Sequence, residues 1–105
     1  MIKVIVTIDL LPNCVGEFLS ILNKSLPAIR AENGCLAYVA MIDIDSQIPT
    51  QNELRQNTII LIETWENMSA LRAPLKAPHM VTFRESAKPF VQHLRHQVLQ
   101  PALDA

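Results

Sequence analysis

Three apolar runs rich in β-branched residues constrain this chain more than any other feature of its sequence. They read IKVIVTID at 2–9, CLAYVAMID at 35–43 and TIILIETWE at 58–66. This composition is typical of β-strands. Between the first two runs, apolar residues recur at helical spacing from Val15 to Ile29, and Gly34 can adopt the left-handed conformation that ends a helix. We therefore predict the order strand, helix, strand, strand, with Asn13 as a candidate cap of the helix.

The last third of the chain completes the pattern. After the third run, two short helical pieces are predicted, and Pro78 suits the first turn of the second piece. The segment 91–100 fits a helix or a strand by its pattern, but one more strand completes a β-α-β-β-α order. We predict a strand there, and hence one α+β domain over residues 1–105, ferredoxin-like β-α-β-β-α-β with an antiparallel sheet.

Composition limits the classes of partner. The chain has 105 residues, of which 50% are hydrophobic, so it can build one core without disulfides or metal, and Cys14 and Cys35 are predicted to be reduced, mostly buried thiols. A net charge of -1 without a lysine or arginine cluster argues against nucleic acid. The N-terminal apolar stretch is too short to span a bilayer and lacks a signal-peptide cleavage site, so we expect a cytoplasmic protein without membrane insertion.

The predicted topology leaves one face of the sheet bare. Both crossover helices lie on the same face, whereas strands such as IILI at 59–62 are apolar on both faces. A second copy of the sheet, related by a two-fold axis, would let the same apolar patch bury itself. We predict a homodimer that packs sheet to sheet.

Glu63 and Trp65 are the first candidate site residues. Alternation along the third strand places them side by side on one face. They could form a pocket wall, in which the indole offers a flat apolar surface and an N–H donor while the carboxylate orients or deprotonates an aromatic substrate. The other interpretation is a core tryptophan with its N–H satisfied and a glutamate paired with an arginine.

His79 is the candidate base. It follows Pro78 at a predicted helix start, where its imidazole could deprotonate a phenol near neutral pH; a partly exposed helix-start residue is the alternative. Tyr38 could fill the core or meet a substrate oxygen through its hydroxyl. Met80 and Phe83 are further candidates for substrate contact, although methionine also fills gaps in packing.

Several motifs, in this order on this pattern of elements, resemble the antibiotic biosynthesis monooxygenase superfamily and, within it, the bacterial quinol monooxygenases. They are ENGCLAYVAMID at 32–43, the long polar insertion before the third strand, IETWENMSALRAPLKAPHM at 62–80 and VLQP at 98–101. The resemblance implies a dimeric α+β barrel. It also implies oxidation of electron-rich aromatic substrates by O₂ without metal, flavin or haem.

Two positions depart from the pattern of the family. Pro74 stands where the family usually has a histidine, which removes a polar side chain from near the predicted pocket and should shorten or bend the helix. Arg84 stands at the turn where the haem-degrading branch has its iron-ligating histidine, so no haem is expected. His93 and His96 would point to opposite faces of a strand without a third ligand nearby, so no metal site is predicted.

The leading hypothesis is a cofactor-independent monooxygenase that oxidises a quinol or a related dihydroxy-aromatic with O₂. A deprotonated, electron-rich phenolate can pass an electron to O₂ itself, so the protein needs only to bind, deprotonate and exclude water. Two alternatives stay open. One is a non-catalytic dimeric small-molecule binding or stress-response module, which Pro74 favours slightly. The other is an isomerase or decarboxylase of a small metabolite, for which Glu63 and His79 would be the acid and base.

Overall fold

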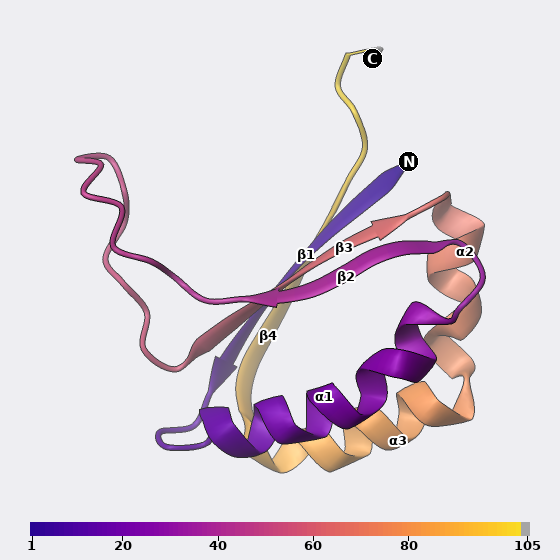
Figure 1. The fold of residues 1–105 in the computed structure, drawn as a ribbon, viewed down its shortest axis with the longest axis horizontal. Coiled ribbons are helices and arrows are strands. Elements are labelled where there is room, and N and C mark those ends of the chain that lie inside the picture. Colours follow the sequence, from indigo (N-terminus) through magenta and orange to yellow (C-terminus); the bar gives the residue numbers. More distant parts are fainter. Residues whose placement is uncertain (104–105) are drawn as a thin grey trace.

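Residues 1–103 are described by the structure, a computed structural model, as four strands and three α-helices (Figure 1). In chain order they are β1 (Ile2–Leu10), α1 (Val15–Arg30), β2 (Cys35–Met41), β3 (Thr58–Trp65), α2 (Met68–Arg72), α3 (Pro78–Ala87) and β4 (Val91–Leu99), with short 3₁₀ turns η1 (Ala73–Lys76) and η2 (Lys88–Phe90) on either side of α3. The strand predicted at 91–100 is confirmed as β4. No helix within the described range is long and apolar enough to cross a membrane.

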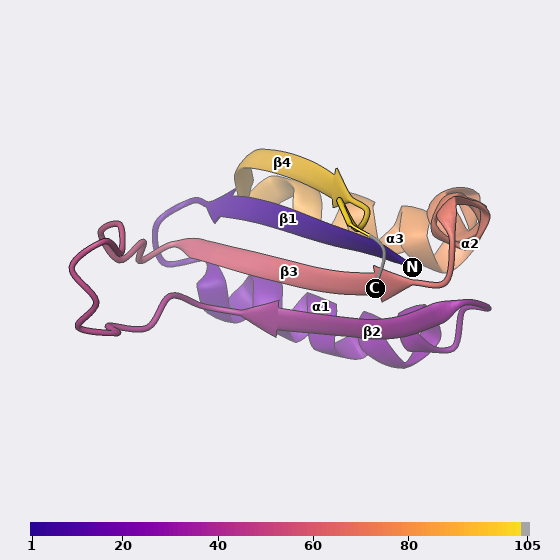
Figure 2. The same cartoon turned by 90° about the horizontal axis from the view of Figure 1, so that it is seen from above.

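The four strands form one antiparallel sheet in the order β2-β3-β1-β4, with α1 and α3 on the same face (Figures 1 and 2). This is the predicted ferredoxin-like α+β fold. Alternation along β1 supplies one side of the core, because its even-numbered side chains are buried against the helices: Ile2, Val4, Val6, Ile8 and Leu10. From α1, the buried residues are Phe18, Leu22 and Ile29, which share one helical face.

Turn chemistry decides where the helices begin and end. Gly34 has φ +85 in the junction between α1 and β2, as its predicted left-handed conformation requires. Pro78 opens α3, as predicted. Pro74 lies in η1, and α2 ends two residues before it at Arg72, so the expected shortening of this helix is confirmed.

Two local predictions are wrong. Asn13 does not cap α1, because it adopts φ 64 in the turn after β1 and the N-cap position falls on Cys14, which makes no side-chain capping bond. Asparagine is one of the residues that tolerate this left-handed conformation, and here it lies two residues before the helix begins. Cys14 and Cys35 are free thiols, but both are half-buried rather than mostly buried.

The long connection between β2 and β3 forms an arm that extends away from the sheet (Figure 1). At its base, the Arg55 guanidinium donates two hydrogen bonds of 2.9 Å to the Asp43 carboxylate. This bidentate contact lowers the pKa of Asp43 to about 2. The arm also carries exposed apolar side chains, namely Ile42, Ile44, Ile48 and Leu54.

The sheet face opposite the helices carries apolar side chains, as predicted. Val39, Ile62 and Ile5 lie opposite one another in a row across β2, β3 and β1, and all three are exposed. The structure adds a second uncovered region at the edge strand. Leu94 and Val98 of β4 share the helix-facing side with Ile8 and Val4, their register partners, yet both remain exposed. The edge of the core at β4 is therefore uncovered in the protomer.

Candidate active site

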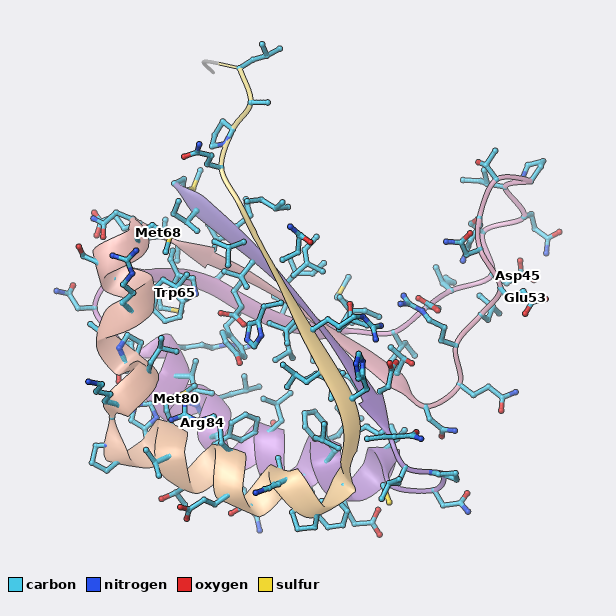
Figure 3. The ribbon with its side chains drawn as sticks, turned by 180° about the vertical axis from the view of Figure 1, so that it is seen from behind. Asp45, Glu53, Trp65, Met68, Met80 and Arg84 are labelled. Atoms are coloured by element: carbon cyan, nitrogen blue, oxygen red, sulfur yellow. The ribbon has the colours of Figure 1, made fainter. Side chains whose placement is uncertain are left out.

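Glu63 and Trp65 form a buried, hydrogen-bonded pair on the helix-facing side of β3. The indole Nε1–H donates to Glu63 Oε1 at 2.9 Å, and the two residues are 6% and 2% exposed. Strand alternation brings them together, as predicted, and Figure 3 shows Trp65 at the end of β3 beside α2. The indole N–H is thus used by Glu63 rather than offered to a substrate. The partner of the Glu63 carboxyl group is therefore Trp65 and not an arginine, the partner considered in the alternative interpretation.

The environment of this pair shifts the titration of two acids. Burial raises the pKa of the Glu63 carboxyl, and the hydrogen bond from Trp65 opposes that shift. Tyr38 lies directly opposite Glu63 on β2 and is also buried. Burial, followed by the nearby Glu63 carboxylate, raises the pKa of the Tyr38 hydroxyl. Tyr38 therefore stays a neutral hydrogen-bond donor at physiological pH, next to a carboxyl group of increased basicity.

His79 has a partner that sequence reasoning missed. Its Nε2 atom lies 2.5 Å from Glu32 Oε1, between the start of α3 and the turn after α1. Its Nδ1 atom is the one buried side-chain nitrogen or oxygen among residues 1–103 without a hydrogen-bond partner. A buried polar atom without a partner costs about 1–3 kcal/mol, so such an atom calls for an explanation.

The two pairs meet at the α1–β2 junction. Cys35 donates its backbone N–H to the Glu32 carbonyl at 3.0 Å, and the same Cys35 is the register partner of Trp65. Glu32, Glu63, Trp65 and His79 are thereby tied to one end of the sheet. The sequence gives Glu32 no visible role beyond its place two residues before Gly34, and local patterns hold no signal for a partner 47 residues away.

The other predicted substrate contacts fall in or near the core. Phe83 is buried against Phe18, with ring centroids 6.2 Å apart in an edge-to-face arrangement. Met80 is partly buried against the core at the start of α3, and Figure 3 places it near Arg84. Arg84 donates a hydrogen bond of 2.6 Å to the Leu75 carbonyl. Met80 therefore remains the better placed of the two candidates for contact with a ligand.

A pocket of about 230 Å³ lies along β2. Its lining residues are Arg30, Cys35, Leu36, Ala37, Tyr38 and Val39. Tyr38 is the predicted site residue that it includes, whereas the predicted pocket lay between the sheet and the second helical layer. Among the described residues, no group of three or more His, Cys, Asp or Glu side chains is arranged to hold a metal ion.

Fold and site together define a ferredoxin-like α+β domain that carries a buried acid–indole pair and a half-buried imidazole at one end of its sheet. The profile of the family described as antibiotic biosynthesis monooxygenase matches residues 1–86. The chain belongs to this family. Over 80 residues, it is 32% identical to the protein named probable quinol monooxygenase YgiN of Escherichia coli K12, with 76% of each chain covered.

Solved structures share the fold at lower sequence identity. The structure of Rv0793 from Mycobacterium tuberculosis has a TM-score of 0.79 at 21% identity, covering 99% of this chain and 97% of that one. The crystal structure of PA3566 from Pseudomonas aeruginosa has a TM-score of 0.77 at 22% identity, covering 97% of this chain and 94% of that one. These likenesses support the fold assignment.

Proposed function

We propose that the protein is a cofactor-independent monooxygenase that oxidises a quinol or a related dihydroxy-aromatic with O₂. The observation that carries the proposal is the buried Glu63–Trp65 pair, in which a carboxyl group of raised pKa is held by a hydrogen bond from the indole N–H. Family membership and the likeness to a protein named as a quinol monooxygenase support the same reading. The indole of Trp65 suits an aromatic ring, and the carboxyl group of Glu63 suits an acidic hydroxyl on that ring.

In the proposed reaction, a base removes the phenolic proton and the phenolate passes one electron to O₂. The resulting radicals combine through a new carbon–oxygen bond. The O–O bond then breaks, so that one oxygen atom stays on the ring and the other leaves as water, with the substrate supplying all the electrons. The protein binds, deprotonates and excludes water. His79 is the proposed base, Glu63 fixes the indole and serves as a second acid–base group, and Tyr38 and Met80 contact the substrate.

Access to this site requires a movable cover, because Glu63, Trp65 and Tyr38 are buried in the protomer. The segment formed by α2 and η1 is the proposed cover. It lies next to the end of β3, and Pro74 is its one buried residue (Figure 3). Opening would separate the partly buried Met68, Ala70 and Leu71 from the core, while most other side chains of the segment are already exposed.

We further propose that the protein acts as a homodimer. The exposed row of Val39, Ile62 and Ile5 gives the open face of the sheet an apolar patch that a second sheet would cover. The exposed Leu94 and Val98 extend the apolar surface around the edge of β4. A stable interface of this kind should bury at least about 1,000 Å² in total.

Oxygen uptake with a panel of quinols tests the proposed activity. His79→Ala should lower turnover by about 10²-fold or more, as loss of a general base does, without unfolding the protein. Trp65→Phe should mainly weaken substrate binding. His93→Ala is the matched control, since His93 is exposed on β4. Quinol binding without any O₂ uptake by the wild type would contradict the proposal and favour a binding module.

A further inference from the structure

The pairing of His79 with Glu32 extends the proposed role of His79 as the base, because it assigns a role to a second residue. We infer that Glu32 is a positioning residue, which holds the His79 ring with its proton on Nε2 and leaves the Nδ1 lone pair free to accept the substrate proton. The inference rests on the proposed function for its catalytic part. Its structural part, the tautomer of His79, can be tested separately.

The geometry at His79 assigns the two ring nitrogens different tasks. Glu32 Oε1 lies 2.5 Å from Nε2, and an ionised carboxylate only accepts hydrogen bonds, so Nε2 must carry the hydrogen. In the neutral ring, Nδ1 then bears the lone pair. Nδ1 is also buried and without a hydrogen-bond partner. A histidine whose one nitrogen is fixed by a carboxylate and whose other nitrogen is bare has the arrangement of an oriented base.

Both partners are held by backbone geometry before any substrate arrives. The Glu32 N–H donates to the Ile29 carbonyl at 3.1 Å, and the Cys35 N–H donates to the Glu32 carbonyl at 3.0 Å. On the other side, Pro78 fixes the first turn of α3, and the Met80 N–H donates to the Ala77 carbonyl at 3.0 Å. Because the side chains project from two fixed turns, the ring orientation is set by the fold.

The Glu32 carboxylate also stabilises His79 after the ring has accepted the substrate proton. Transfer of the phenolic proton to Nδ1 leaves a phenolate on the substrate and an imidazolium on His79. Glu32 then faces a full positive charge at hydrogen-bonding distance, and this contact stabilises the charge-separated state. The same proton can be returned when the peroxide loses water. A purely structural ion pair between α3 and the turn after α1 would make no use of the unpaired Nδ1.

The test combines ¹⁵N NMR of histidine-labelled protein with steady-state O₂ uptake. With the imidazole neutral, His79 should show the Nε2-protonated tautomer, assigned by loss of its signals in His79→Ala. Glu32→Ala should mix the tautomers and lower kcat/KM by about 10- to 100-fold, by analogy with the loss of a partner that orients a metal-ligating histidine. Glu32→Gln should keep the tautomer, because its amide oxygen still accepts from Nε2, and should recover part of the turnover.

Glu85→Ala is the matched control, since it removes an exposed carboxylate from the helix that carries His79. Circular dichroism and light scattering establish that each variant folds. An Nδ1-protonated ring in the wild type, or a Glu32→Ala variant with unchanged tautomer and turnover, would overturn the inference. A tautomer that depends on Glu32 in a protein without O₂ uptake would instead overturn the proposed function and leave the pairing intact.

Discussion

Gly34 allows a direct test of how closely the α1–β2 junction packs on α2. The residue has φ +85, and an added Cβ would lie 2.5 Å from the Cβ of Ala70. The left-handed conformation costs an alanine about 1–2 kcal/mol. The overlap forces a backbone shift, which costs about 1–3 kcal/mol in a packed region. Gly34→Ala should therefore lower the free energy of unfolding by about 2–5 kcal/mol.

Urea denaturation at fixed protein concentration measures this effect, because the single tryptophan, Trp65, is buried and reports unfolding by fluorescence. Gly16→Ala is the matched control. An added Cβ at Gly16 meets nothing within 4 Å, and in a helix this change should stabilise by up to about 1 kcal/mol. Combining Gly34→Ala with Ala70→Gly should remove the overlap but not the backbone strain. A single Gly34→Ala variant within about 0.5 kcal/mol of the wild type would refute the reasoning.

Two further predictions concern the buried carboxylate and the open face. Burial raises the pKa of Glu63 above its ordinary value of 4.5, so the folded state favours the protonated form, and ionisation of Glu63 removes stability as the pH rises through its folded pKa. Glu63→Gln should therefore gain stability over the wild type as pH increases from 4.5 to 7.5, and an advantage that is constant across this range in urea denaturation would contradict the assignment. Ile62→Lys should convert the proposed dimer to a monomer in light scattering, whereas Leu19→Lys on α1, at 37% exposure against 38% for Ile62, should not; a wild-type protein that is monomeric at micromolar concentration would sink the dimer proposal.

Local patterns in the sequence determine much of the fold and one half of the site. Side chains alternate between the two faces of a strand, so the order of residues in β3 alone places Glu63 beside Trp65. Proline and glycine act through their own backbone limits, so Pro74 ends α2 early and Gly34 turns the chain into β2. These effects involve residues close in sequence and need no knowledge of the tertiary structure.

The other half of the site is decided by packing between distant segments. His79 contacts Glu32 because α1 and α3 lie on the same face of the sheet, and no local pattern encodes a contact across 47 residues. Tertiary structure also decides which partner satisfies the Trp65 N–H, since strand alternation fixes only that Glu63 is within reach. The exposure of the β4 side chains is also decided by tertiary structure. Whether an edge strand is covered depends on where the helices pack on the sheet.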